Sequence, residues 1–197
     1  MIAKTAIIHP DVHLGENVII EDYCNIGCPV KGVSLPTVIG DNAHIRSHTV
    51  IYAGNTIGES LKTGHHVSVR ECNTIGNNVS IGTSSVIEHH SIIEDNVRIH
   101  SQAFVPEFSL LRNNCWLGPQ VVLTNAKFPC SPGVKEALKG PTIGVKAKLG
   151  ANVTVLPGIN VGDGALVGAG SVVAHDVLPH TICAGNPARK LRDIHYT

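Results

Sequence analysis

Four polar residues that could act on one substrate stand eighteen positions apart in the sequence: Glu71, His89, Glu107 and Asn125. In a chain that folds with a repeat of this length, such residues stack in one column, about one strand spacing apart. Two carboxylates then flank the imidazole of His89 and orient its ring, as a general base requires. We take His89 as the candidate catalytic base, with Glu71 or Glu107 holding its second nitrogen and Asn125 binding the substrate. A solvated surface histidine is the alternative.

The aliphatic residues recur with a period that predicts such a repeat. Isoleucine, valine or leucine returns at every sixth position between residues 69 and 123, continues backward to residue 39 with Thr63 out of pattern, and resumes from 143 to 173. Neither a helix nor an ordinary strand has this period, which is typical of a β-solenoid. Three hexads, each with one short strand and one corner, would close a triangular coil. The large aliphatic residue points inward, and glycine or asparagine forms the bend at positive φ.

This pattern predicts one all-β domain over residues 1–197, because a solenoid cannot be divided into independent units. We expect coils over residues 6–178, with a slip of one residue inside a loop around 32–36. A projecting loop is expected over 125–141, where the repeat is lost. Residues 179–197 are expected to form a C-terminal cap that contains a short amphipathic helix. Loops on a rigid scaffold often carry function, which draws attention to the projecting loop.

Composition limits the class of protein. The chain has 20 glycines, 4% aromatic residues and 43% hydrophobic residues, which suits a thin aliphatic core. A formal charge of zero without a basic run argues against a nucleic-acid partner. We find neither a long apolar stretch nor a signal peptide, and therefore expect a cytoplasmic protein without membrane contact. The six cysteines form no CxxC pair and are expected to be reduced, mostly as buried small residues.

The end of the chain carries a family resemblance. The hexads, together with Val167-Gly-Ala-Gly-Ser-Val-Val and Gly185-Asn-Pro-Ala-Arg189, resemble the left-handed β-helix, hexapeptide-repeat acyltransferases over nearly the whole chain. This resemblance implies a left-handed parallel β-helix, acetyl-CoA as the acyl donor, no metal, and a homotrimer with active sites between subunits. It also implies that CoA lies in a groove along the C-terminal coils. The candidate CoA-binding residues are Gly150, Ala151, Gly168, Ala169, Arg189 and Lys190.

Structural roles are the alternatives for these CoA candidates. Hexads require small residues in any case, so the glycines and alanines could serve packing alone. The basic pair could equally be the last-turn charges of the predicted helix. Trp116 is expected to anchor a face or an interface.

Two shorter segments resemble particular groups within this family. Leu117-Gly-Pro-Gln-Val-Val-Leu-Thr-Asn-Ala-Lys-Phe-Pro looks like the stretch of nucleotide-linked amino-sugar N-acetyltransferases that carries Thr-Asn where other members carry a loop histidine. Thr83-Ser-Ser-Val-Ile-Glu-His-His90 is similar to the segment of bacillosamine-type sugar acetyltransferases that contains their catalytic His-Glu pair. His89 falls on the histidine of that pair. His90 stands in place of the glutamate, and it cannot orient an imidazole as an anion.

Other residues are candidates for contacts with the acceptor. Arg70 could meet a sugar or a nucleotide phosphate, and a surface ion pair is the alternative. His65 and His66 lie in the one coil whose inward position is not aliphatic, where they could line the edge of a substrate site or form a structural bend. Lys127 in the projecting loop completes the set of substrate-binding candidates.

These observations predict an acetyl-CoA-dependent N-acetyltransferase that acts on a nucleotide-linked (dTDP or UDP) amino sugar. One alternative is a related O- or N-acyltransferase that acts on another small acceptor, such as a hexose, serine or tetrahydrodipicolinate. A second is a γ-type carbonic anhydrase, which would bring three histidines together on Zn²⁺. A third is a scaffold without catalytic activity. The Arg-x-Asp stretch of the carbonic anhydrases is missing, because the chain reads Arg46-Ser-His.

Overall fold

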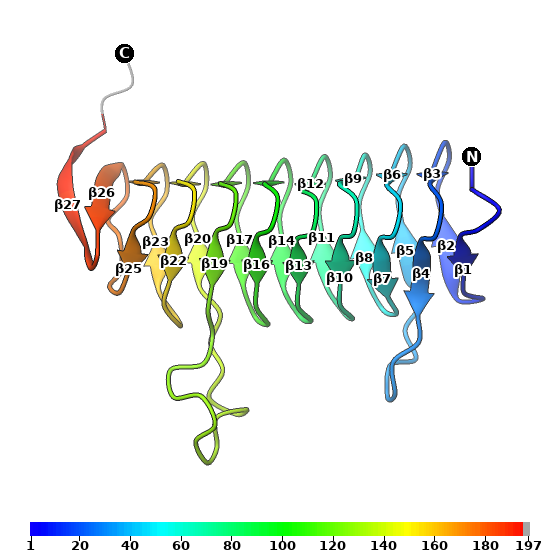
Figure 1. The fold of residues 1–197 in the computed structure, drawn as a ribbon, viewed down its shortest axis with the longest axis horizontal. Coiled ribbons are helices and arrows are strands. Elements are labelled where there is room, and N and C mark those ends of the chain that lie inside the picture. Colours follow the sequence, from blue (N-terminus) through cyan, green and yellow to red (C-terminus); the bar gives the residue numbers. More distant parts are fainter. Residues whose placement is uncertain (195–197) are drawn as a thin grey trace.

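The six-residue period of the sequence becomes a three-sided solenoid in the computed structural model, which describes residues 1–194. Figure 1 shows the coils in a row from the N-terminus to the C-terminus, with two loops leaving the same side of the body. The three walls are sheets of nine, eight and ten strands. All pairings are parallel except the last one of the third sheet. The described residues form no helix, so the chain is all-β.

Each coil contributes one short strand to each sheet. Sheet 1 contains β1 (Ile7–Ile8), β4 (Asn25–Cys28), β7 (Val50–Tyr52), β10 (Ser68–Val69), β13 (Val86–Ile87), β16 (Phe104–Val105), β19 (Val122–Leu123), β22 (Thr154–Val155) and β25 (Val172–Val173). Sheet 2 contains β2 (Val12–Leu14), β5 (Thr37–Ile39), β8 (Thr56–Ile57), β11 (Thr74–Ile75), β14 (Ile92–Ile93), β17 (Leu110–Leu111), β20 (Thr142–Ile143) and β23 (Asn160–Val161). Sheet 3 contains β3 (Ile19–Ile20), β6 (His44–Ile45), β9 (Lys62–Thr63), β12 (Ser80–Ile81), β15 (Arg98–Ile99), β18 (Trp116–Leu117), β21 (Lys148–Leu149), β24 (Leu166–Val167), β26 (Thr181–Gly185) and β27 (Ala188–Asp193).

The sheets meet at three edges, which we call corners. The first corner joins sheet 1 to sheet 2, the second joins sheet 2 to sheet 3, and the third joins sheet 3 to sheet 1 of the next coil.

Aliphatic side chains fill the solenoid because the second residue of most strands points inward. In sheet 1, Val69 pairs with Ile87 and Ile87 with Val105, and all three are 0% exposed. This register has the predicted eighteen-residue repeat, which is therefore confirmed. Thr63, the residue out of pattern, is also buried, and its hydroxyl accepts a hydrogen bond of 2.9 Å from the backbone N–H of Arg46.

Glycine and asparagine have different roles at the corners. Asn96 has a φ of 59° and His90 a φ of 56°, so residues with side chains form many of the left-handed bends. Gly82 is needed for another reason, because a Cβ there would lie 2.3 Å from the backbone nitrogen of Ser101 in the next coil. The prediction that glycine or asparagine takes the bend is therefore only partly correct. At Gly82 it is the close approach of stacked coils that requires glycine.

Both projecting loops leave the first corner (Figure 1). The larger one separates β19 from β20 and contains only turns, such as the hydrogen bond of 3.1 Å from Ala137 N to Val134 O. The smaller one separates β4 from β5. There the pairing of Ile26 with Ile51 spans twenty-five residues rather than eighteen, so the predicted slip of one residue lies in a loop that adds seven residues to this coil.

The predicted C-terminal helix is wrong, because this segment forms a β-hairpin. Strand β26 extends sheet 3 by pairing with β24, and β27 returns antiparallel to it. Thr181 and Cys183 are both buried and lie two positions apart, which is the spacing of inward residues in a strand. Residues on one face of a helix would lie three or four positions apart. The turn consists of Asn186 and Pro187, joined by a cis peptide bond. Residues 195–197 of the predicted cap lie outside the described part of the chain.

Within residues 1–194, the structure contains no helix that is long and apolar enough to span a membrane.

Candidate active site

The four residues of the predicted column lie on the first corner, on successive coils. Strands β10, β13, β16 and β19 end directly before this corner, and their parallel register places Glu71, His89, Glu107 and Asn125 above one another. The larger projecting loop begins at the same place. The column therefore stands on regular strands and lies next to the larger projecting loop.

Glu107 connects the histidine of the column to the asparagine. Its Oε1 lies 3.6 Å from His89 Nε2, within ion-pair distance and beyond hydrogen-bond length. Its Oε2 accepts a hydrogen bond of 2.6 Å from Asn125 Nδ2. The side chains of His89 and Glu107 are 28% and 24% exposed, so both can meet a ligand without being fully solvated.

His90 and Phe108 complete the environment of His89. Nδ1 of His89 lies 2.8 Å from Nδ1 of His90, so one ring donates a proton and the other accepts it. The Phe108 ring packs against both imidazoles, with centroids 5.9 Å apart in each case. Sequence reasoning missed Phe108, although it stands eighteen positions after His90 and so falls in a column of its own.

Glu71 is held by Arg70 rather than by His89. The guanidinium makes two hydrogen bonds to the carboxylate, of 2.9 and 3.1 Å, and also lies 3.6 Å from Glu88 Oε2 and over the ring of Tyr52. Burial by itself would raise the pKa of the Glu71 carboxyl. Hydrogen bonds from its own backbone N–H and from Arg70, with the charges of Arg70 and His89, outweigh that effect and bring the pKa below its usual value of 4.5.

The remaining acceptor candidates lie elsewhere. His65 and His66 stand on the third corner, where His65 Nδ1 lies 3.0 Å from Ser47 Oγ and His66 stacks on His48 at a centroid distance of 4.7 Å. Lys127 lies in the larger projecting loop, with its ammonium 5.7 Å from the ring centroid of Phe128. Within a single copy of the protein, Arg70 therefore lies next to the column, whereas His65 and His66 lie on a different corner.

Three of the CoA candidates line an open hollow on the outer face of sheet 3. Its volume is about 500 Å³, and Gly150, Gly168 and Ala169 line it together with Trp116 and Leu166. The glycines also serve packing, because a Cβ on Gly150 would lie 2.6 Å from the backbone nitrogen of Ala169. The hollow combines a small-residue floor with an aromatic wall, which suits an apolar ligand segment.

The other CoA candidates lie near this hollow or at the end of the chain. Ala151 stands on the third corner, and its carbonyl accepts a hydrogen bond from Gly170 N. Arg189 and Lys190 belong to β27, where Lys190 Nζ lies 2.6 Å from Asp193 Oδ1. Within the described residues, no group of three or more histidine, cysteine, aspartate or glutamate side chains is placed to hold a metal ion.

The fold and the repeat define the class of the protein. The model of the bacterial transferase hexapeptide (six repeats) matches residues 74–107, and the model of the hexapeptide repeat of succinyl-transferase matches residues 17–53 and 142–174. A solved structure of a "putative acetyltransferase" from Bacillus cereus is 25% identical, covers 72% of this chain and 78% of its own, and has a TM-score of 0.60. The solenoid is accordingly a left-handed parallel β-helix of the hexapeptide-repeat type.

Curated relatives match shorter stretches. A "putative acetyltransferase" of Staphylococcus aureus is 46% identical over 56 residues, or 28% of each chain. Serine acetyltransferase 2 of Arabidopsis thaliana is 54% identical over 60 residues, which are 30% of this chain and 19% of that protein. The match thus spans about a quarter of the length of these relatives. Together with the fold, the matched models show that the chain carries the hexapeptide repeats of bacterial transferases.

Proposed function

We propose that the protein is an acetyl-CoA-dependent N-acetyltransferase whose acceptor is the amino group of a nucleotide-linked (dTDP or UDP) amino sugar. The observation that carries this proposal is the connected set of His89, Glu107 and Asn125 at the base of the larger projecting loop. A base, a carboxylate and an amide side by side suit an acceptor that presents an amine among hydroxyl groups. The hexapeptide repeats and the similarity to acetyltransferases support acetyl-CoA as the donor.

The spacing of His89 and Glu107 suits an amine. Because 3.6 Å separates His89 Nε2 from Glu107 Oε1, one amine nitrogen can lie within about 3 Å of both atoms. If the Nδ1–H group of His89 donates the hydrogen bond to Nδ1 of His90, then Nε2 carries no proton and its lone pair faces this position. The side-chain nitrogen of Asn125 is held by Glu107, so its side-chain oxygen Oδ1 can accept a hydrogen bond from a sugar hydroxyl.

The reaction would proceed in two steps. The amine attacks the thioester carbonyl carbon of acetyl-CoA, and its proton passes to His89 Nε2 as the C–N bond forms. The carboxylate of Glu107 stabilises the resulting imidazolium. The tetrahedral intermediate then collapses, the C–S bond breaks, and the CoA thiolate takes the proton from His89. A base of this kind contributes about 10² to 10⁴-fold to the rate.

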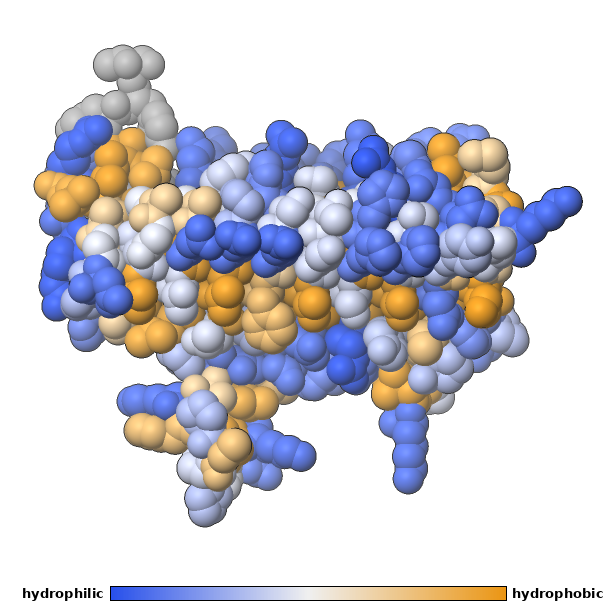
Figure 2. Space-filling model, in the orientation of Figure 1, coloured by the Kyte–Doolittle hydropathy of each residue, from blue (hydrophilic) through white to orange (hydrophobic). Residues whose placement is uncertain are grey.

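A complete site requires two copies of the chain, which supports the proposal of a homotrimer. His89 lies on the first corner, and the hollow lined by Gly150 and Gly168 lies on sheet 3, the wall opposite that corner. Figure 2 shows an apolar band along sheet 1 that could form the contact between copies. The outward residues of its strands are mostly apolar: Val50, Val86, Phe104, Val122 and Val172.

Release of free thiol from acetyl-CoA tests the proposal. The acceptors would be dTDP- and UDP-linked 3-amino and 4-amino sugars, with the matching neutral nucleotide sugars as controls. We expect release with one amino sugar and not with its hydroxyl counterpart. If acetyl-CoA binds and no amino sugar gives release, the acceptor class is wrong. If acetyl-CoA does not bind, the acyltransferase assignment itself fails.

A further inference from the structure

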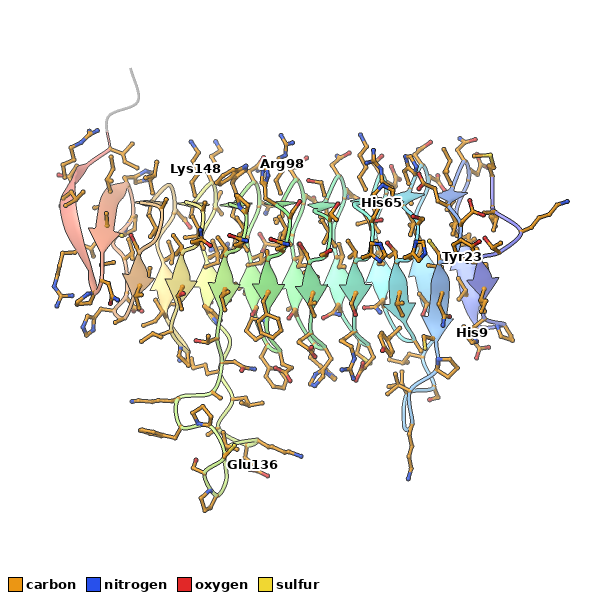
Figure 3. The ribbon with its side chains drawn as sticks, viewed as in Figure 1. His9, Tyr23, His65, Arg98, Glu136 and Lys148 are labelled. Atoms are coloured by element: carbon orange, nitrogen blue, oxygen red, sulfur yellow. The ribbon has the colours of Figure 1, made fainter. Side chains whose placement is uncertain are left out.

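Two cations flank a small residue on the outer face of sheet 3. Lys62 and Arg98 are the outward residues of β9 and β15, and both neighbour Ser80 of β12 in the parallel register. The two cations are thus two strand spacings apart, about 10 Å. Figure 3 shows Arg98 and Lys148 on one side of the solenoid and the larger projecting loop, which carries Glu136, on the opposite side.

Lys62, Ser80 and Arg98 form a row that we call the basic row. A hollow opens on each side of it. The hollow toward the third corner has a volume of about 270 Å³ and adds Arg46, Gly64 and Gly82 to the row. The hollow toward the second corner has a volume of about 380 Å³, and its other lining residues are serine, valine and asparagines. Neither hollow is lined by a carboxylate. A ligand that spans the row would therefore meet only positive or neutral groups.

The cations of this row have no acidic partner among the ion pairs of the described residues. Arg70 and Arg112, by contrast, are paired with Glu71 and Glu94. None of the ion pairs found in residues 1–194 includes Arg46, Lys62 or Arg98. Like charges on neighbouring strands repel each other unless a counterion lies between them. Ser80, between the two cations, leaves room for that counterion and offers it a hydroxyl.

The basic row adjoins the hollow assigned to the donor. Arg98 pairs with Trp116 of the next strand, and the His100 ring lies 4.7 Å from the Trp116 ring. The apolar hollow that begins at Trp116 and the basic row that ends at Arg98 thus occupy consecutive coils of one face. Two ligands bound side by side on this face would meet near His100.

We propose that Arg46, Lys62, Ser80 and Arg98 form a binding site for the diphosphate of the nucleotide-linked acceptor. This proposal rests on the proposed function and assigns to the acceptor a subsite outside the His89 column. Two arginines supply the planar fork that pairs with phosphate oxygens, and Lys62 supplies a third positive charge. A diphosphate can also come from CoA itself, so the test must separate the two sources.

Direct binding measurements distinguish these sources without requiring turnover. Calorimetric titrations would use inorganic pyrophosphate, UDP, dTDP and CoA, on the unmodified protein and on Arg98→Gln, Lys62→Gln and the double variant. Lys4→Gln is the matched control, because Lys4 is an exposed cation remote from both hollows. Thermal unfolding checks that every variant is folded.

We expect each substitution to weaken binding of UDP or dTDP about tenfold, and both together by more, while CoA binding and the control stay unchanged. The proposal is overturned if the unmodified protein binds no nucleoside diphosphate, if the variants bind it equally well, or if only CoA binding weakens. Nucleotide binding that depends on this row, without acetylation of any amino sugar, would keep the site and reject the proposed function.

Discussion

The first corner and the basic row on the outer face of sheet 3 differ in how their charged side chains are paired. On the corner, Glu107 faces His89 and Asn125, and Arg70 is paired with two glutamates. On the face, Lys62 and Arg98 take part in none of the ion pairs of residues 1–194. Side chains with fixed partners keep one orientation, which proton transfer requires. Side chains without partners can take a partner from the ligand.

This contrast assigns different kinetic effects to the two regions. Substitutions of His89 and Glu107 on the corner should lower turnover, because these side chains touch the reacting amine. Substitutions on the face should weaken binding and leave turnover at saturation unchanged. Four predictions sharpen or break this division, and they follow in order of decreasing effect.

The largest effect is expected for His89→Ala. Loss of the base should lower kcat by about 10² to 10⁴-fold at neutral pH, while the affinity for acetyl-CoA stays nearly the same. Steady-state kinetics and a donor titration measure the two quantities. His13→Ala is the control, because His13 is an exposed histidine on β2, away from the column. An unchanged kcat would show that the acceptor amine loses its proton without help from the protein.

A smaller effect is expected for Glu107→Gln. The variant keeps an oxygen that can accept the hydrogen bond from Asn125, but it removes the charge that stabilises a protonated His89. We expect kcat to fall about 10 to 100-fold, consistent with the loss of one charge-assisted interaction. If kcat stays unchanged, Glu107 has only a structural role.

The coils and the column could be predicted because burial fixes the register. Each buried aliphatic residue fixes the positions of its sequence neighbours within a coil. The position of His89 above Glu71 therefore follows from the spacing of Val69 and Ile87. The same reasoning would have found the basic row, since Lys62, Ser80 and Arg98 are also eighteen residues apart.

Side-chain pairing and the end of the solenoid could not be predicted in this way. A repeat places Glu71 in a column but does not say that Arg70, its neighbour in sequence, binds it through two hydrogen bonds. The C-terminal hairpin was missed because the aliphatic period stops at Val173, while charged residues at 189–193 suggested a helix face. Pairing of β26 with the open edge of β24 decided the structure there.

On the face of sheet 3, Trp116→Ala should weaken acetyl-CoA binding. The indole forms a wall of the hollow that Gly150 and Gly168 line, and its loss removes apolar contact area from a bound donor. We expect the Kd for acetyl-CoA to rise about tenfold, with kcat at saturating donor nearly unchanged. Trp116→Phe should keep most of the affinity. A fall in kcat with an unchanged Kd would mean that this face takes part in the chemical step, and the division would fail.

The smallest effect on turnover is expected for Glu71→Gln, which should instead lower stability. The Glu71 side chain is 10% exposed, and its replacement leaves Arg70 without its main partner, at a cost of about 1 to 3 kcal/mol at pH 7. Because folding lowers the pKa of Glu71, its stabilising contribution is complete above the usual value of 4.5 and is lost as the pH falls through the lower folded-state pKa.

Urea unfolding of the unmodified protein and of Glu71→Gln should therefore show a difference at pH 7 that shrinks progressively below pH 4.5. Glu59→Gln, at an exposed glutamate outside the ion pairs of the described residues, is the control. The decisive outcome is the comparison with Glu107→Gln. If Glu71→Gln keeps full stability but loses as much turnover as Glu107→Gln, then Glu71 holds His89 during the reaction, and its pairing with Arg70 is secondary.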